Sequence, residues 1–267
     1  MNKNIPIVLC IAGSDSGGGA GVQADIKTLN TLKVFATTAI TCITAQNTRE
    51  VLSIKRQQPS VVADQIEAVL KDFQISAVKI GMLYDKVLMK AVLKSLEELH
   101  DTPIIVDPVM ISKSGDDLLK PDSVSFFIKN IVPKSFLITP NLHEASRITN
   151  MKKIKSRSHI EECFNKFIDL GATNILIKGG HSEDISKSTD YLSYDNKIFT
   201  ISSKRYHTLN THGTGCTLSA AISGNIALGM NLLDATRKAK NFINLAIKNS
   251  FSIGMGNGPL NHFSQEQ

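Results

Sequence analysis

IPIVLCIA-GSDSGGGAG-VQADIKTLNTL, residues 5–32, joins three patterns in one short stretch. The first eight residues are apolar and partly β-branched, which predicts a buried strand. The last eleven place apolar residues at helical spacing and predict an amphipathic helix. The glycine-rich segment between them turns the chain, so the stretch predicts the first strand–loop–helix unit of an α/β fold.

The same alternation repeats along the chain and predicts a mainly parallel sheet with helices on both faces, in a single domain spanning 1–267. Further strands are predicted at 34–44, 77–80, 103–106, 136–139 and 174–177. Further helices are predicted at 61–73, 86–99, 124–131, 160–170, 217–228 and 232–251. Segments 190–194 and 198–202, joined around Asp195 and Asn196, predict a hairpin.

Composition excludes several classes of protein. The net charge of +6 comes without a dense basic run interleaved with aromatic residues, which disfavours a nucleic-acid-binding protein. The four cysteines form no C-x-x-C pair, which disfavours a zinc site or a disulfide framework and is compatible with the cytoplasm. No apolar segment has the length of a membrane span, and the N-terminal apolar run lacks the features of a signal peptide.

Polar residues and glycines follow each predicted strand. Because ligands bind where the carboxyl ends of parallel strands converge, we expect these residues to share one edge of the sheet. Glycines also end strands and polar residues also cap helices without any ligand, so each segment alone has a structural explanation. The segments are GSDSGGGAG (13–21), AQN (45–47), GM (81–82), DPV (107–109), PN (140–141) and KGGH (178–181).

Two nucleotide-binding patterns can be compared with the first loop. Gly19-Ala-Gly-Val-Gln-Ala24 matches G-x-G-x-x-A, but the second strand ends in Gln46 and Asn47 instead of the carboxylate that a dinucleotide's ribose requires. A G-x-x-x-x-G-K-[ST] loop is absent from the sequence, which excludes an ordinary P-loop NTPase. A turn that needs positive φ angles is the structural alternative.

HGTGCTLSAA, residues 212–221, carries a second glycine loop into an apolar helix. Gly213 and Gly215 allow backbone amides to converge at a helix N-terminus, an arrangement that attracts phosphate. A thiol at this position, Cys216, is expected to have a lowered pKa and to act as a base or a nucleophile. A small residue that packs at the start of a helix is the structural alternative.

Taken together, these segments resemble the hydroxymethylpyrimidine and phosphomethylpyrimidine kinases of thiamine biosynthesis, a family of the ribokinase-like superfamily. The resemblance implies a three-layer α/β/α sandwich with a small β-hairpin flap. It also implies ATP-dependent phosphorylation of 4-amino-5-hydroxymethyl-2-methylpyrimidine and then of its monophosphate. The matching segments are 12–28, TAQNT (44–48), VKIGML (78–83), VDPVM (106–110), KSGDDLL (113–119), TPNLHEA (139–145), IKGGH (177–181), HGTGCTLSAAI (212–222) and GMGNGPLNH (254–262).

The resemblance also implies roles for individual residues. Gly213, Thr214, Gly215 and Cys216 match the family's anion hole, with the cysteine as base or proton-accepting partner, and Lys178 matches its phosphate-binding lysine. Gln46 matches the residue that recognises the aminopyrimidine, whose edge an amide complements. Asp25 is implied near the hydroxymethyl group. The remaining pocket residues implied are Gly13, Ala20, Met82 and Val109.

Magnesium, ATP and the assembly are further implications of the resemblance. Asp107, Asn141 and Glu144 match positions that hold Mg²⁺, partly through water, and hard oxygen ligands suit that ion. The hairpin is expected near the adenine or over the site, and relatives commonly form homodimers. The segments depart from the family pattern at Gly17, where serine is common, and at Asn257, where histidine is frequent.

Two other functions remain in competition. Pyridoxal kinases share the scaffold, and the glutamine of TAQNT at Gln46 favours the pyrimidine over vitamin B6. A non-catalytic sensor of nucleotides or vitamins would keep the fold without producing ADP. The presence of Cys216, Lys178, Asp107 and Glu144 argues against such a sensor.

Overall fold

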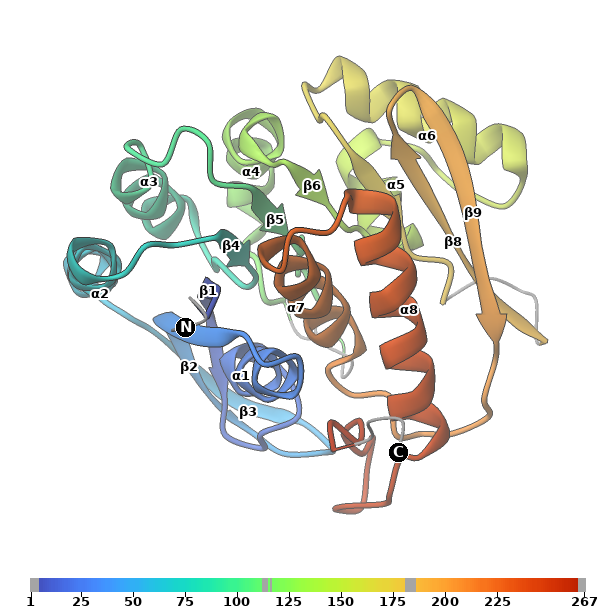
Figure 1. Ribbon diagram of the computed structural model, residues 1–267, viewed down its shortest axis with the longest axis horizontal. Coiled ribbons are helices and arrows are strands. Elements are labelled where there is room, and N and C mark those ends of the chain that lie inside the picture. The colour runs from blue at the N-terminus through green and yellow to red at the C-terminus, as the bar shows by residue number, and fades with distance from the viewer. Residues whose placement is uncertain (1–4, 112–114, 116, 181–185, 264–267) are drawn as a thin grey trace.

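The computed structural model describes residues 5–111, 115, 117–180 and 186–263 (Figure 1). One nine-stranded sheet runs through it in the order β3-β2-β1-β4-β5-β6-β7-β8-β9. Six neighbouring strands of the sheet run parallel to one another: β2, β1, β4, β5, β6 and β7. Strand β3 at one edge and strands β8 and β9 at the other edge pair antiparallel with their neighbours. The strands are β1 (Ile7–Asp15), β2 (Phe35–Gln46), β3 (Val51–Arg56), β4 (Ala77–Ile80), β5 (Ile104–Val106), β6 (Leu137–Ile138), β7 (Ile175–Ile177), β8 (Lys187–Tyr194) and β9 (Lys197–Lys204).

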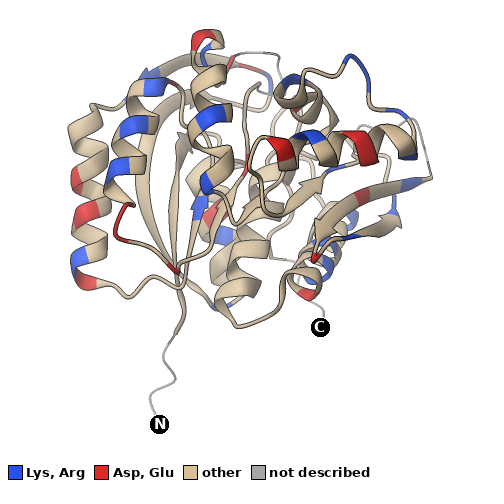
Figure 2. Cartoon of the chain, turned by 90° about the horizontal axis from the view of Figure 1, so that it is seen from above, with Lys and Arg blue, Asp and Glu red and all other residues tan. Residues whose placement is uncertain are grey.

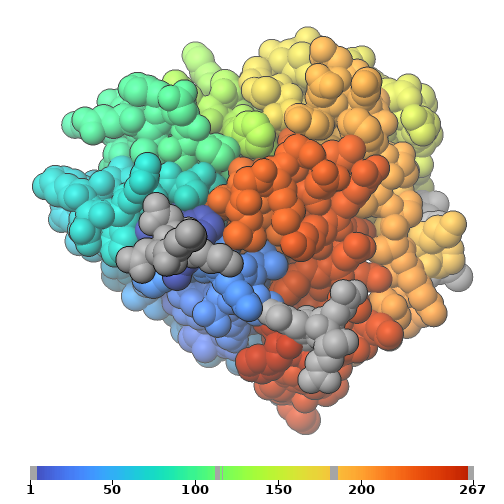
Figure 3. Space-filling view, in the orientation of Figure 1, coloured from blue at the N-terminus to red at the C-terminus, as the bar shows by residue number. Residues whose placement is uncertain are grey.

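Helices cover both faces of this sheet. Helices α1, α7 and α8 lie together on the face turned to the viewer in Figures 1 and 3, and the other helices lie on the opposite face. The helices are α1 (Gly21–Thr31), α2 (Pro59–Asp72), α3 (Lys86–Ser95), α4 (Val124–Asn130), α5 (Leu142–Thr149), α6 (Arg157–Asp169), α7 (Thr214–Ala227) and α8 (Leu232–Lys248), with short 3₁₀ turns at Pro121–Ser123 and Val132–Lys134. The predicted three-layer α/β architecture is therefore confirmed.

Strand β1 shows why two cores form. Successive side chains of a strand point to opposite faces, and here both faces are apolar. Val8 and Cys10 pack into the core beneath α1, α7 and α8, while Leu9 and Ile11 pack into the core beneath α2 to α6. Charged residues are spread over the helices, and others lie in strands and loops (Figure 2). Within the described ranges, no helix is long and apolar enough to cross a bilayer.

Two elements were not predicted from the sequence. The edge strand β3 has no fully buried residue, so it lacks the apolar run that marked the other strands. Helix α5 is only eight residues long, but Asn141 and Glu144 form a capping box at its start, and that spacing is a recognisable signal. Helix α7 begins at Thr214, three residues earlier than predicted, which places Cys216 in its first turn.

The predicted hairpin is present as β8 and β9. Asp195 and Asn196 both have positive φ, as a tight two-residue turn requires. Because β8 pairs with β7, the hairpin extends the central sheet at its edge. Parts of two predicted motifs, Lys113, Ser114 and Asp116 of KSGDDLL and His181 of IKGGH, lie outside the described residues.

Candidate active site

A cavity of about 1200 Å³ lies at the carboxyl ends of the parallel strands, beside the start of α7. The predicted convergence of the strand ends is thus confirmed, since residues at the carboxyl ends of β1 and β2, and residues that follow β1, β4, β5, β6 and β7, all line it. Of the predicted site residues, only Asp25 is missing from the lining. Those that line it are Gly13, Ala20, Gln46, Met82, Asp107, Val109, Asn141, Glu144, Lys178, Gly213, Thr214, Gly215 and Cys216.

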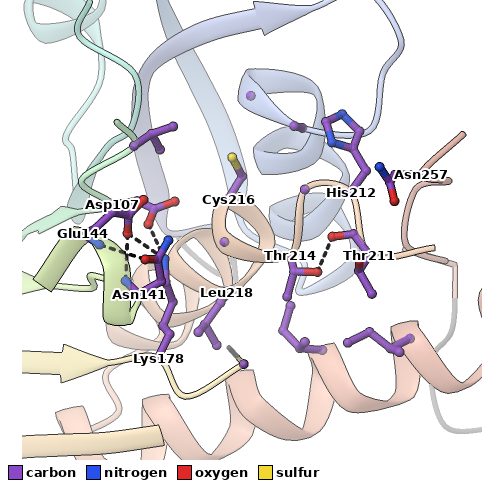
Figure 4. Close-up of a pocket in the computed structure, with 18 of the residues that line it drawn as sticks. Asp107, Asn141, Glu144, Lys178, Thr211, His212, Thr214, Cys216, Leu218 and Asn257 are labelled. Carbon is purple, nitrogen blue, oxygen red and sulfur yellow. Dashed lines mark hydrogen bonds and ion pairs between the residues drawn. The ribbon is translucent and has the colours of Figure 1, made fainter. Parts of the chain in front are cut away.

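Lys178 and two carboxylates form the charged end of the cavity (Figure 4). The Lys178 Nζ lies 2.7 Å from Asp107 Oδ1 and 3.9 Å from Glu144 Oε2. Burial would lower the pKa of Lys178, but the two carboxylates hold it above its usual value. The lysine side chain keeps 14% of its surface exposed, so a charged ligand can reach it.

Asn141 and Glu144 cap α5 at this end. The Asn141 Oδ1 accepts hydrogen bonds from the backbone amides of His143 and Glu144, and Glu144 Oε2 accepts one from Asn141 N. Burial raises the pKa of Glu144 to about 7. The amide oxygen of Asn141 thus caps α5, and the predicted part of Asn141 in holding Mg²⁺ stays a prediction.

The glycine loop before α7 closes tightly against the first glycine loop. Gly213 has a φ of +79°, and a Cβ placed on it would lie 1.8 Å from the Gly19 carbonyl oxygen. A Cβ on Gly215 would lie 3.2 Å from Asp107 Oδ2 and 3.3 Å from Lys178 Nζ. Gly215 thus lies beside the lysine in the first turn of α7, and backbone amides at a helix N-terminus can bind an anion.

Cys216 lies between this charged end and His212 (Figure 4). The residue is partly exposed, and the backbone amide of Gly21 favours the thiolate form, which lowers the pKa. Burial raises the pKa of Cys216 to about 11, although the Lys79 cation opposes this shift. The lowered pKa expected from the helix N-terminus is therefore wrong, because desolvation of the thiolate outweighs the helix dipole.

Asp25 lies behind the wall of the cavity. Its Oδ2 accepts a hydrogen bond of 2.9 Å from Lys79 Nζ, and both side chains are fully buried. Burial raises the pKa of Asp25 to about 6, and the carboxylates around Lys79 hold the pKa of that lysine above its usual value despite burial. Of this pair, Lys79 borders the cavity and Asp25 does not, and neither side chain is exposed; the predicted position of Asp25 near the substrate stays a prediction.

Asp15 and His212 organise the other end of the cavity. The Asp15 carboxylate accepts hydrogen bonds from the amides of Gly17, Gly19 and Ala20, and its Oδ2 lies 2.8 Å from His212 Nε2. Burial opposes ionisation, but these contacts hold the pKa of Asp15 below its usual value. Both residues were missed from the sequence, although both lie in motifs that were singled out.

Gln46, Met82 and Val109 line the cavity as the sequence predicted. A Cβ on Gly13 would lie 3.0 Å from Met82 Sδ, so the glycine lets this methionine approach β1. Gln46 lies beside His212, with 3.4 Å between Gln46 Nε2 and His212 Nε2. This end therefore combines apolar walls with the side-chain amides of Gln46 and Asn257, a lining that suits a small planar heterocycle.

The base of the hairpin binds the backbone directly after Lys178. The Asp190 carboxylate accepts hydrogen bonds from Gly179 N at 2.9 Å and from Lys240 Nζ at 2.7 Å. Residues 188, 190 and 203–205 line the cavity, whereas the turn at Asp195 and Asn196 is not among the lining residues. The hairpin thus borders the site with its base, and its tip does not cover it.

The model of the phosphomethylpyrimidine kinase family matches residues 15–261. The chain belongs to the phosphomethylpyrimidine kinase family. It is 41% identical to the hydroxymethylpyrimidine/phosphomethylpyrimidine kinase of Bacillus subtilis over 96% of this chain and 94% of that protein. This relationship shows that the protein is a kinase related to thiamine biosynthesis.

Solved structures of two related kinases resemble this family member. A phosphomethylpyrimidine kinase from Clostridium difficile has a TM-score of 0.79 and 38% identity, covering 91% of this chain and 99% of that one. A pyridoxal kinase of Bacillus subtilis in complex with ADP has a TM-score of 0.89 and 32% identity, covering 97% and 98%. These neighbours confirm the ribokinase-like fold.

Proposed function

We propose that this kinase transfers the γ-phosphoryl group of ATP to the hydroxymethyl oxygen of 4-amino-5-hydroxymethyl-2-methylpyrimidine. A second transfer to the resulting monophosphate then gives the diphosphate. The observation that carries the proposal is that one cavity has Lys178 at one end and His212 at the other, with Cys216 between them and Gln46 beside His212. A ring with its reactive oxygen and a nucleotide's phosphates suit these two ends.

The residues divide the work of phosphoryl transfer. Gln46 recognises the amino group and the ring nitrogen, and the ring lies against Met82 and Val109. The acceptor oxygen lies beside Cys216, whose thiolate takes its proton in the first transfer. Lys178 and the first-turn amides of α7 neutralise charge on the transferring group, so catalysis rests on positioning and electrostatics.

Asp107 and Glu144 are the residues proposed to hold Mg²⁺, largely through water. Within the described residues there is no cluster of three or more His, Cys, Asp or Glu side chains that could cage a metal. Two carboxylates beside a phosphate site fit this ion, because magnesium is commonly held by one or two carboxylates, waters and substrate phosphates. When bound, it would neutralise negative charge on the nucleotide's phosphates.

The test incubates purified protein with ATP, MgCl₂ and the hydroxymethylpyrimidine and follows the products by mass spectrometry. We expect the monophosphate to appear first and the diphosphate later, with two ADP formed per diphosphate. Accumulation of monophosphate alone would restrict the enzyme to the first transfer. ATP consumption without any phosphorylated pyrimidine would overturn the proposal.

A pyridoxal kinase is the second candidate, favoured by the likeness to the Bacillus subtilis pyridoxal kinase. Its substrate also carries a hydroxymethyl group on a six-membered ring. The kcat/KM values for the pyrimidine and for pyridoxine, measured side by side, decide between the two. We expect the pyrimidine to be preferred because Gln46 complements its aminopyrimidine edge. The homodimer and the cytoplasmic location remain predictions from the sequence.

A further inference from the structure

The backbone on the amino side of Lys178 is fixed by the strand beside it. The Lys178 N–H donates a hydrogen bond of 2.8 Å to the carbonyl oxygen of Pro140, in the segment that follows β6. On the other side of β7, the pairing with β8 ends at Ile177 and Tyr191. The ladder of the sheet therefore holds the peptide group before Lys178 and ends short of the peptide group after it.

A side chain of β8 binds the peptide group that follows Lys178. The Gly179 N–H donates a hydrogen bond of 2.9 Å to Asp190 Oδ1, and both residues are buried. A Cβ on Gly179 would lie 1.7 Å from the Thr189 carbonyl oxygen, so glycine is needed for this close approach to β8. The Asp190 carboxylate thus continues the contact between β7 and β8 beyond the end of the ladder.

These two hydrogen bonds determine where the side chain of Lys178 starts. Peptide groups are planar, so the two planes on either side of a Cα define its φ and ψ and the direction of its Cα–Cβ bond. Pro140 holds one plane, and Asp190 holds the other. From this base the Lys178 Nζ reaches to 2.7 Å from Asp107 Oδ1. A turn of either plane would move the ammonium group, which lies at the far end of a long side chain.

Lys240 of α8 supplies the counter-ion of the Asp190 carboxylate. Its Nζ donates to Asp190 Oδ2 at 2.7 Å and to Ser188 Oγ at 3.0 Å. Only 8% of the lysine side chain and 4% of the aspartate side chain are exposed. Two apolar side chains of similar volume often stabilise a fold as well as a buried ion pair does. Stability alone therefore does not require this pair, whereas the buried Gly179 N–H requires an acceptor.

We infer that Asp190 is a positioning residue for phosphoryl transfer, which orients Lys178 through the Gly179 amide, and that Lys240 keeps the carboxylate in place. Because Asp190 belongs to the hairpin and Lys240 to α8, these two elements then take part in catalysis without touching the transferring group. The inference rests on the proposed role of Lys178 at that group.

The experiment compares two double variants that differ in the hydrogen-bond acceptor at position 190. Asp190→Asn with Lys240→Met removes both charges and keeps an oxygen for the Gly179 N–H. Asp190→Leu with Lys240→Met removes the oxygen as well, at nearly the same volume. For phosphorylation of the hydroxymethylpyrimidine, we expect the first variant to keep a kcat close to that of the wild type.

The leucine variant should lose kcat by about tenfold, which is less than the roughly 10²-fold that a 1 Å misplacement can cost. The loss is moderate because Arg205 Nη1 also holds this segment, 2.7 Å from the Gly180 carbonyl oxygen. The KM of the pyrimidine should not change, since its ring is proposed to lie at the other end of the cavity.

The same comparison in a Lys178→Gln background separates positioning from general damage. If Asp190 acts through the lysine ammonium, exchanging Asp190→Asn for Asp190→Leu has little further effect once that ammonium is gone. A substitution that only loosens the fold would lower kcat by the same factor in both backgrounds. Lys238→Met changes an exposed lysine of α8 outside the cavity lining and should leave kcat unchanged.

A loss of kcat in the leucine variant that disappears in the Lys178→Gln background supports the inference. Equal kcat in the two double variants, or the same loss in both backgrounds, would assign the pair a structural role and overturn the inference alone. If the leucine variant does not fold, Asp190→Ala with Lys240→Met removes the same acceptor with less volume and decides instead. Undiminished turnover by Lys178→Gln would overturn the proposed role of Lys178 and this inference with it.

Failure of the wild type to phosphorylate the pyrimidine would overturn the proposed function and leave the inference to be decided by the same variants with pyridoxine as the acceptor.

Discussion

Two lysine–aspartate pairs lie at the same site and differ in their access to solvent. Lys79 and Asp25 are 2.9 Å apart and fully buried, whereas Lys178 and Asp107 are 2.7 Å apart with 14% of the lysine side chain exposed. A sealed pair has no ligand to neutralise and influences its neighbours only through its charge. An accessible pair can exchange its partner for a phosphate. The same type of ion pair therefore stabilises the fold at Lys79 and Asp25 and is available for catalysis at Lys178 and Asp107.

The sealed pair should dominate stability. Lys79→Met leaves the Asp25 carboxylate buried without a cation, and breaking such a pair costs about 3–5 kcal/mol of unfolding free energy. Urea denaturation of the variant measures this loss. Lys79→Met combined with Asp25→Val removes both charges and should regain most of the stability. A single variant as stable as wild type would show that the pair is not ionised.

The accessible pair should dominate turnover. Lys178→Gln removes the cation that faces the transferring group, so kcat should fall roughly 10²- to 10³-fold, as for loss of one well-placed donor. Its effect on unfolding should be smaller than that of Lys79→Met, because water reaches Asp107 once the lysine is gone. Lys197→Gln, an exposed lysine on β9, serves as the control. Equal turnover in both variants would contradict this division of roles.

The contrast also explains what sequence reasoning could find. Asp107 and Lys178 each follow a buried strand, and the rule that parallel strands converge placed both at the cavity. Asp25 also matched a family motif, but its surroundings depend on a lysine 54 residues away. Lys79 was missed because it lies inside the apolar strand β4, where sequence patterns predict core residues. The positions of residues at strand ends can thus be predicted from the sequence, whereas ion pairs between residues of different helices and strands cannot.

The pKa of Cys216 is a second property that could not be predicted from the sequence alone. The position of the thiol at a helix start is a local property that the sequence predicts correctly. Its desolvation depends on how the first glycine loop and β4 pack around it, which only the folded chain defines. The hydrogen bonds of His212 and Asp15 depend in the same way on contacts across 197 residues. Short-range geometry was therefore predictable, and electrostatic surroundings were not.

Cys216 is close enough to both pairs for their charges to act on its pKa, and its substitution separates the two phosphoryl transfers. Cys216→Ala should slow the first transfer by about 10²-fold, the low end for a general base, because a pKa of about 11 leaves only on the order of one thiol in 10⁴ ionised at pH 7 and able to accept the proton. The second transfer uses a phosphate oxygen that is already ionised and should change far less. Single-turnover experiments with each acceptor measure the two rates. Equal slowing of both would leave the thiol a positioning role only.

The pH dependence of Cys216 alkylation gives the finest comparison of the pairs. With a pKa of about 11, the thiolate fraction and hence the rate of reaction with iodoacetamide should rise about tenfold per pH unit from pH 7 to 10. Removing the sealed pair, by Lys79→Met with Asp25→Val, should slow alkylation at a given pH, because Lys79 lowers this pKa more strongly than Asp25 raises it. Peptide mass spectrometry distinguishes Cys216 from the three buried cysteines. A plateau below pH 9 would mean that the charge of Lys79 outweighs burial at the thiol.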